Sequence, residues 1–403
     1  MFYPLSASTW GNEELDAIQR VLKNGRTTMG DEVRAFEREF ADYHGRRFGI
    51  MVNSGSSANL IAVAALFYKK DNPLQRGDDV LVPAISWATT YHPLQQHGLS
   101  MSIMDVELET LNFDWKALYA HDVQAKSNYS HMFGRPATRA VMGVSILGNP
   151  ANLATLSGYA KEHGLYFIED NCESLDAEMG GKKTGTFGDM STFSFFFSHH
   201  IQTMEGGMIL TDDEELAQLC VSLRAHGWTR DLPKDNLIAE PRENDRYEAY
   251  RFVVPGYNVR PLELSGAIGR VQLRKLPAFT EQRRKNLAIF QNLFQGDDRF
   301  IIQKENGKSS AFSFPIILNP KHCSIKDRDR VFMGLINAGI EHRVVTGGNI
   351  LRHDVIKHYD YSVIGGSAPN ADIVHDYGFF VGNYPQDLTE QLHKLHEVLS
   401  QAI

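Results

Sequence analysis

Hydrophobic and polar positions along the chain follow two spacings. Short continuous apolar runs, which are typical of buried strands, cover residues 48–52, 79–83, 165–170 and both sides of residues 198–200. Between these runs, apolar residues recur three or four positions apart, as on one face of an amphipathic helix. This alternation of strands and helices predicts a mostly parallel sheet with helices on both faces, the arrangement of a large α/β domain.

The last third of the chain repeats the alternation on a smaller scale. A charged helical stretch follows about residue 273, an apolar strand covers residues 312–318, and helices are expected at 328–338 and 388–399. We therefore expect a large domain over residues 1–270 and a small C-terminal α/β domain over residues 271–403. The pattern contains no internal repeat, coiled coil or low-complexity tract.

Two amphipathic helices are expected before the first strand. The first is expected to begin at Asn12, whose side chain can cap it, with Leu15, Ile18 and Leu22 on one face. The second follows Asp31.

Composition and charge limit the classes of partner. The chain has 403 residues, 42% of them hydrophobic, and a net charge of −8 without a cluster of lysines or arginines. This balance favours neither a nucleic-acid nor a membrane partner, so an anionic ligand has to be bound by local groups. The N-terminal stretch lacks a basic leader with an apolar core, and no apolar run approaches the roughly 20 residues of a membrane span. We expect a cytoplasmic location.

A serine- and glycine-rich turn follows the first strand. Residues 54–59 read SGSSAN and lead into a fully apolar helix. Gly55 permits a tight turn, and the hydroxyls of Ser56 and Ser57, with the free amides of a helix N-terminus, can bind a phosphate dianion. Serine and glycine also cap helices for structural reasons alone, so the turn by itself leaves both interpretations open.

Two further strands end in residues that suit a ligand site. The strand at 165–170 ends in Asp170, followed by Glu173, and acids at the carboxyl end of a strand lie where α/β sheets bind ligands. Trp87 follows the strand at 79–83 and can stack on an aromatic ring. The alternative is a purely structural role, in which the acids cap a helix and the tryptophan packs in the core.

A polar segment interrupts the apolar residues between 192 and 211. Ser198, His199 and His200 lie between two apolar runs and are followed by the pair Gly206 and Gly207. We expect a tight loop that carries both histidines at the edge of the sheet. Taken alone, this stretch is equally well explained by two ordinary loop histidines.

The spacing of this segment resembles a known active site. His199 lies five residues after Ser194, and Gly206 and Gly207 lie seven and eight residues further on, as in the PLP-dependent nucleotide-sugar aminotransferases of fold type I. In that family the fifth residue after the serine is a lysine that holds pyridoxal phosphate as a Schiff base. The sequence SHHIQTMEGG, with His199 at that position, is similar to a dehydratase variant within the family.

The resemblance assigns cofactor-binding roles along the chain. It implies that Trp87 stacks on the cofactor ring, that Asp170 pairs with its pyridinium nitrogen and that Glu173 contacts its phenolic oxygen. Asn258 is implied to reach the cofactor phosphate of the neighbouring subunit, and hence a homodimer. The other implied cofactor-binding residues are Gly55, Ser56, Ser57 and Ser194.

Histidine in place of lysine changes the chemistry that the resemblance implies. Imidazole forms no stable covalent link to the cofactor, but it can act as general base and acid near neutral pH. We therefore expect noncovalently held pyridoxamine phosphate or pyridoxal phosphate, with His199 as the catalytic residue. The expected reaction removes the 3-hydroxyl of a nucleotide-linked 4-keto-6-deoxy sugar, with GDP as the expected nucleotide, and glutamate restores the aminated cofactor in the same pocket.

Two other functions are consistent with the sequence. An aminotransferase would need another lysine, of which Lys182 and Lys183 are the nearest upstream, although their context predicts a turn. A non-catalytic regulator that binds cofactor or sugar would also tolerate the loss of the lysine.

Cysteine spacing bears on metal chemistry. Cys172, Cys220 and Cys323 lie far apart and form no CxxC pair, so we expect neither a disulfide framework nor a metal site. Iron–sulfur chemistry, which related CDP-sugar dehydratases use, is therefore not expected.

Two polar stretches have no assigned role. Residues 124–139 are longer than the family pattern and are expected to form an exposed insertion, and residues 227–252 to form a loop near the substrate or a partner subunit.

Overall fold

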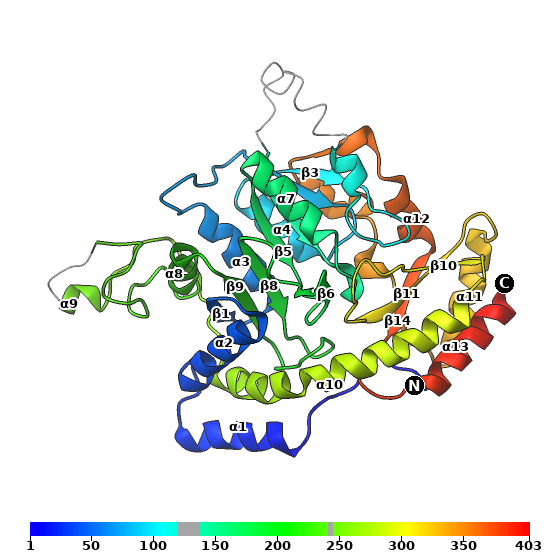
Figure 1. Cartoon of the computed structure of the whole chain (residues 1–403), viewed down its shortest axis with the longest axis horizontal. Helices are drawn as coiled ribbons and strands as arrows, with labels where there is room; N and C mark the ends of the chain where they lie inside the picture. The colour runs from blue at the N-terminus through cyan, green and yellow to red at the C-terminus, as the bar shows by residue number, and fades with distance from the viewer. Residues whose placement is uncertain (120–137, 241–244) are drawn as a thin grey trace.

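The fold consists of a large sheet between helices and a smaller second sheet (Figure 1). It is seen in a computed structural model, which describes residues 1–119, 138–240 and 245–403. The prediction of an exposed insertion at residues 124–139 therefore falls largely outside the described residues, where β4 begins only at Thr138.

The large sheet has eight strands, and all but one of them run parallel. In spatial order the strands are β1 (Phe48–Val52), β9 (Gly207–Thr211), β8 (Met190–Ser194), β5 (Tyr166–Asp170), β4 (Thr138–Val144), β2 (Asp79–Pro83), β3 (Ser100–Met104) and β13 (Tyr361–Val363). Only β9 runs antiparallel to its neighbours β1 and β8. The predicted mostly parallel sheet is confirmed, and the loop between β8 and β9 is the short connection that carries the histidines.

Apolar residues alternate across this sheet because both of its faces are covered. Along β2, Val80 and Val82 face a core that includes α3 (Gly55–Leu66), α4 (Ala88–Gln96) and α8 (Glu214–Leu223), whereas Leu81 faces α7 (Leu153–His163). On the second face, α2 (Asp31–His44) packs over β1 and the neighbouring strands. A strand between two apolar layers reads as continuously hydrophobic, which is why the sequence pattern of these strands was clear.

The smaller sheet is antiparallel and is built from the last part of the chain. Its order is β10 (Phe300–Ile302), β11 (Ser313–Leu318), β14 (Gly378–Gly382) and β12 (His342–Arg343). The helices in this part of the chain are α11 (Ile325–Asn337), α12 (Pro369–Tyr377) and α13 (Thr389–Ala402). The division at residue 270 stays a prediction: residue 270 lies within α10 (Glu263–Phe294), and β13 returns to the large sheet.

Helix α10 connects the two parts and begins earlier than the sequence pattern suggested. Figure 1 shows it running along the base of the molecule from α2 toward α11 and α13. A Cβ atom on Gly269 would lie 2.5 Å from the Phe36 ring, and one on Gly266 would lie 2.7 Å from the Val33 nitrogen, so these glycines let α10 approach α2 closely. Glycines inside a helix and Pro277 obscured the helical pattern.

Helix α1 (Asn12–Asn24) corrects one expectation about the N-terminus. Its cap is Gly11, not Asn12, and the Glu14 carboxylate accepts a 2.7 Å hydrogen bond from the Gly11 amide. The helix buries Glu14, Ala17 and Val21 toward α10, while Leu15 is 50% exposed. The apolar face predicted from the spacing therefore points away from the body, because Glu14 faces inward to contact α10 residues including Lys275.

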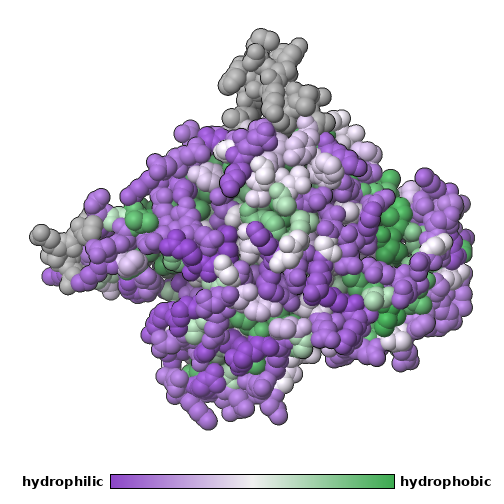
Figure 2. All heavy atoms as spheres, in the orientation of Figure 1, coloured by the Kyte–Doolittle hydropathy of each residue, from purple (hydrophilic) through white to green (hydrophobic). Residues whose placement is uncertain are grey.

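The remaining elements are short. They are β6 (Glu178–Met179), β7 (Lys182–Lys183), α9 (Asp245–Glu248) and the 3-10 helices η1 (Ile146–Gly148), η2 (Val345–Gly347), η3 (Ile350–Arg352), η4 (Asp354–His358) and η5 (Ile364–Gly366). Figure 1 shows the connection that contains α9 projecting from the body beside α8. Figure 2 shows mostly hydrophilic residues on the visible face, with hydrophobic patches toward the smaller sheet and its helices. Among the described residues, no helix has the length and apolarity to cross a membrane.

Candidate active site

The turn after β1 forms an open helix N-terminus. The Ser54 hydroxyl caps α3 by accepting a 3.1 Å hydrogen bond from the Ser57 amide, and Ser56 is exposed with its hydroxyl 3.2 Å from that of Thr89. A Cβ atom on Gly55 would lie 2.5 Å from the Ser194 Cβ, so glycine is needed where α3 starts against β8. The structure thus brings Gly55 against Ser194, and Ser56 and Ser57 follow in the first turn of α3, where free backbone amides can bind an anion.

Asp170 is buried at the carboxyl end of β5 and is held by hydrogen bonds from three segments. Its Oδ2 accepts from the Asn59 amide and the Thr90 hydroxyl, each at 2.9 Å, and its Oδ1 accepts from the Cys172 amide at 3.2 Å. Thr192 in turn donates to the Asn59 oxygen at 2.6 Å. The carboxylate therefore has one fixed orientation, set by α3, α4 and β8.

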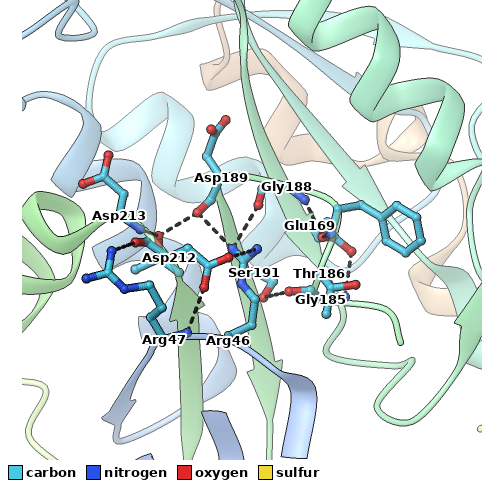
Figure 3. A network of polar contacts seen from close by, with 12 residues as sticks. Arg46, Arg47, Glu169, Gly185, Thr186, Gly188, Asp189, Ser191, Asp212 and Asp213 are labelled. Carbon is cyan, nitrogen blue, oxygen red and sulfur yellow. Dashed lines mark hydrogen bonds and ion pairs between the residues drawn. The ribbon is translucent and has the colours of Figure 1, made fainter. Parts of the chain in front are cut away.

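The two acids at the end of β5 face opposite sides of the sheet. Glu169 is fully buried on the side away from Asp170, and its carboxylate accepts hydrogen bonds of 2.6–2.7 Å from the amides of Gly185, Phe187 and Gly188. Figure 3 shows this carboxylate among the residues that tie the loop before β8 to Arg46 and Asp212. Glu169 therefore holds the loop before β8 in place. The sequence alone did not distinguish this acid from Asp170.

The Glu173 carboxylate accepts a hydrogen bond from the amide of a residue with a strained backbone conformation. The Leu147 amide donates to its Oε2 at 2.9 Å, and Leu147 has a φ of 53° within η1, at the end of β4. Burial, with the nearby negative charge of Asp170, raises the pKa of Glu173 to about 7. Strained residues cluster at functional sites, and the Gly148–Asn149 turn in the sequence was the only signal for this one.

Both histidines lie in the loop between β8 and β9, as predicted from the apolar runs. His199 is partly buried, its Nδ1 has no hydrogen-bond partner among the described residues, and its ring lies 5.1 Å from that of Phe312. His200 is fully buried, with its ring 5.5 Å from Phe312. Burial, followed by the charge of Arg283, lowers the pKa of His199 to about 3 and that of His200 well below its usual value.

The N-terminal segment closes one side of this loop. The Trp10 indole donates to the carbonyl of Gln202 at 3.1 Å, and the Gln202 side chain donates to the carbonyl of Ala7 at 3.0 Å. Phe312 and Arg283, which lie beside the histidines, come from the C-terminal third of the chain. Sequence reasoning missed both residues because neither belongs to a recognisable motif.

Two further candidates are exposed. Trp87 is 60% exposed at the N-terminus of α4, the helix that also supplies Thr90. Asn258 is exposed and accepts a 3.1 Å hydrogen bond from Arg260, and the next residue's carbonyl accepts from the Asn53 amide at 3.0 Å. Asn258 therefore lies next in the chain to Val259, which contacts the residue before the turn at 54–59.

Of the lysines and cysteines considered from the sequence, Cys172 lies at the site through its amide bond to Asp170, whereas Lys183, Cys220 and Cys323 lie in other surroundings. Lys183, on β7, forms an ion pair with Asp176 and lies 4.3 Å over the Tyr43 ring. Cys220 is buried in α8 and Cys323 precedes α11. Within the described parts of the chain, no group of three or more His, Cys, Asp or Glu residues could hold a metal ion.

Comparison with known proteins identifies the family. The profile of the DegT/DnrJ/EryC1/StrS aminotransferase family matches residues 8–399. The GDP-4-keto-6-deoxy-D-mannose 3-dehydratase of Yersinia pseudotuberculosis is 46% identical over 401 residues, which cover 99% of this chain and 98% of that protein. This chain belongs to the DegT/DnrJ/EryC1/StrS aminotransferase family.

Solved structures of the family share the fold. GDP-4-keto-6-deoxymannose 3-dehydratase with a trapped PLP–glutamate geminal diamine superposes with a TM-score of 0.92 at 44% identity, covering 98% of this chain and 100% of that one. A mutant of that enzyme with bound GDP-perosamine superposes with a TM-score of 0.91 at 43% identity, with the same coverage. The predicted fold type I architecture of this family member is confirmed.

Proposed function

We propose that this chain is a pyridoxamine-phosphate-dependent 3-dehydratase of a nucleotide-linked 4-keto-6-deoxy sugar, with GDP-4-keto-6-deoxy-D-mannose as its substrate. The observation that carries the proposal is His199, which occupies the position of the family's cofactor-binding lysine in the loop between β8 and β9. The 3-dehydratases that resemble this chain at 44–46% identity over almost its whole length support the same reaction.

The residues at the ends of β1, β5 and β8 fit a pyridoxal-type cofactor. The open N-terminus of α3 and the hydroxyls of Ser56, Ser57 and Ser194 would hold its phosphate. The Asp170 carboxylate, fixed by Asn59 and Thr90, would pair with the pyridine nitrogen, and Trp87 has an exposed ring that would stack on the cofactor. The carboxyl of Glu173, whose pKa is about 7, would share a proton with the ring oxygen.

His199 would perform the proton transfers. When bound, the cofactor supplies an electron sink that stabilises the negative charge formed during C–H and C–O bond cleavage. An uncharged imidazole accepts a proton, and the resulting imidazolium, in a site whose burial disfavours its charge, donates the proton readily to the departing 3-hydroxyl. The rings of Phe312 and Phe196 limit the access of water to the imidazole.

Glutamate is the proposed amino donor and would use the same pocket. The trapped PLP–glutamate geminal diamine in one structure of the homologous dehydratase supports the donor, and the GDP-perosamine bound in a mutant of that enzyme supports a nucleotide-linked sugar. The proposed products are a 3-deoxy-4-keto sugar, water from the departing 3-hydroxyl and ammonia, which hydrolysis releases from the amino group that glutamate supplied. The sugar would be a precursor of a deoxysugar such as colitose in a lipopolysaccharide O-antigen. We further propose a cytoplasmic location, which cell fractionation would test.

An aminotransferase function is less well supported. The Lys183 amino group already forms an ion pair with Asp176 and lies over the Tyr43 ring. Borohydride reduction separates the two functions, because it would fix the cofactor to the protein only if a lysine is bonded to it. A non-catalytic regulator would bind the cofactor but give no turnover.

We also propose a homodimer in which Asn258 contacts the partner's cofactor phosphate. Asn258 is exposed, and aromatic side chains gather on the nearby connection between α8 and α10: the half-buried Trp228 stacks on the exposed Tyr250 at 5.6 Å and lies 5.8 Å from the exposed Phe252. Mixing inactive Asn258→Ala and His199→Asn proteins tests this arrangement. Recovered activity in the mixture supports a shared site, whereas no recovery after verified subunit exchange contradicts it.

The direct test of the function is a product assay. The purified chain is incubated with pyridoxamine phosphate, glutamate and GDP-4-keto-6-deoxy-D-mannose, and the sugar is analysed by mass spectrometry and NMR. We expect loss of the 3-hydroxyl together with formation of 2-oxoglutarate. A 4-amino sugar as the main product would instead support the aminotransferase function.

A further inference from the structure

A buried arginine without a carboxylate partner lies behind the two histidines. Arg283, on α10, is 2% exposed and forms no ion pair within the described residues. Its Nη1 donates to the carbonyl of Phe312 at 3.0 Å and to the carbonyl of Asn383, while its Nε has no partner among those residues. A buried charge without a counter-ion is costly, so a purely structural role for it needs a reason.

Neutral side chains already connect the same elements. Asn286, three residues further along α10, donates to the Asn383 side chain at 3.0 Å and to the carbonyls of Tyr384 and Gln386. Asn383 also donates to the Ala311 carbonyl at 2.7 Å. Side-chain amides therefore already join α10 to the residues next to β11 and β14, so a neutral side chain can make contacts of the kind that Arg283 makes.

The arginine acts on the histidines through one aromatic residue and through its charge. Phe312, whose carbonyl it holds, has its ring 5.1 Å from that of His199 and 5.5 Å from that of His200. The charge of Arg283 disfavours the protonated form of both histidines.

The other charged groups near the histidines do not offset this cation. Arg284, also on α10, acts in the same direction on His200. The acids of the site accept hydrogen bonds from other groups: Asp170 from Asn59 and Thr90, and Glu173 from the Leu147 amide.

We propose that Arg283 is a positioning residue for His199: its unpaired guanidinium keeps the imidazole in the uncharged form, and its hydrogen bond to Phe312 holds the aromatic wall against the ring. In the reaction put forward above, on which the catalytic part of this inference rests, an uncharged His199 is ready to accept a proton. Once protonated, it is a stronger acid beside the cation and passes the proton on.

Histidine titration by NMR tests the proposal without any turnover. The protein is labelled at the histidine rings, the His199 signal is assigned by its loss in His199→Asn, and its midpoint is measured in a titration that extends from pH 8 to below the wild-type pKa of about 3. Arg283→Gln removes the charge but keeps an amide donor for the Phe312 carbonyl, and Arg283→Lys keeps the charge. Arg284→Met is the matched control, because the Arg284 guanidinium bonds the carbonyls of Ser309 and Asp176 instead.

We expect the His199 midpoint to rise by about one pH unit or more in Arg283→Gln, the usual effect of removing a neighbouring like charge, and to stay near the wild-type value in Arg283→Lys and Arg284→Met. An unchanged midpoint in a folded Arg283→Gln protein overturns the proposal. If Arg283→Gln does not fold, the wild-type titration decides: a midpoint at or above the usual histidine value of about 6.5 also overturns it.

Activity then separates this inference from the proposed function. If the enzyme dehydrates the sugar, the acid limb of its pH–rate profile should move to higher pH in Arg283→Gln together with the NMR midpoint. A shifted midpoint in a protein without dehydratase activity would leave the role of Arg283 standing and contradict the function. If the protein dehydrates the sugar but the His199 midpoint does not move in Arg283→Gln, the proposed function stands and the role of Arg283 is contradicted.

Discussion

Asn59 donates a 2.9 Å hydrogen bond to the Asp170 carboxylate, although the two residues lie 111 positions apart in the chain. The bond joins the first turns of α3, where a phosphate would bind, to the end of β5, where a pyridine nitrogen would bind. The distance between the two halves of the cofactor site is therefore set by one short contact, and Thr192 on β8 holds the same asparagine at 2.6 Å.

Asp170→Asn should reduce activity far more than stability. The amide can still hydrogen-bond but cannot hold the proton on the pyridine nitrogen, so we expect a loss of turnover on the order of 10²-fold or more, as for other fixed electrostatic groups. Dehydration rate, cofactor absorbance and Tm are measured together. Asp16→Asn, on the exposed surface of α1, is the matched control. Near-normal turnover with full cofactor occupancy would show that Asp170 does not have this role.

His199→Lys should allow covalent attachment of pyridoxal phosphate. Because the spacing of residue 199 from Ser194 resembles that of the family lysine, the new amino group is expected to reach the cofactor, and dehydration should fall sharply. Borohydride reduction followed by peptide mass spectrometry locates the adduct. Absence of an adduct at residue 199 in protein that binds the cofactor would contradict the spacing argument.

His199→Asn should leave cofactor binding intact and lower dehydration by about 10²–10⁴-fold, the usual contribution of general acid–base catalysis. Deoxygenation of the sugar and half-transamination with glutamate are followed separately, so that the step that needs the imidazole is identified. If dehydration persists at more than about a tenth of the normal rate, a smaller loss than that range allows, the base has to be sought elsewhere, first at His200.

Gly55→Ala should destabilise the fold and weaken cofactor binding. The added methyl group would lie 2.5 Å from the Ser194 Cβ and 3.0 Å from the Cys172 sulfur, and overpacking of this kind costs about 1–3 kcal/mol. Gly158→Ala, in α7, is the control, because no atom lies within 4 Å of its new Cβ and alanine favours a helix by about 1 kcal/mol. Urea unfolding and cofactor titration measure both effects. Equal stability of the two variants would contradict the close packing of α3 on β8.

Glu173 should make the stability of the cofactor-free protein depend on pH. Its pKa is raised from 4.5 to about 7 in the folded protein, so folding takes up a proton between these values. The favourable contribution is complete below about pH 4.5 and is lost as the pH rises to about 7, with a slope of at most about 1.4 kcal/mol per pH unit. Denaturant unfolding of wild type and Glu173→Gln at pH 5 and pH 7 measures this slope. The glutamine variant should lose less stability over that interval, and parallel losses would show that the carboxyl does not titrate there.

The sequence by itself determined the secondary structure of most of the large domain and the residues at the strand ends. The strands at 48–52 and 79–83 were predicted with the bounds that the structure has, and the helix expected after residues 54–59 is present but begins earlier, at Gly55. These features depend on neighbouring residues: an apolar run fills a strand buried on both faces, and a serine side chain caps the helix that follows it.

Only the tertiary structure decided which groups surround the histidines and the acids of the candidate site. The partners of Asp170, the strained amide at Leu147 and the wall formed by Phe312 and Arg283 come from segments whose proximity depends on strand order and on the path of α10. The spacing of Leu15, Ile18 and Leu22 did not give the direction in which their face of α1 points, because the inward position of Glu14 is set by α10 residues including Lys275, 261 positions away. Local spacing tells which residues share a face of a helix, but the direction of that face is decided by what the rest of the chain packs against it.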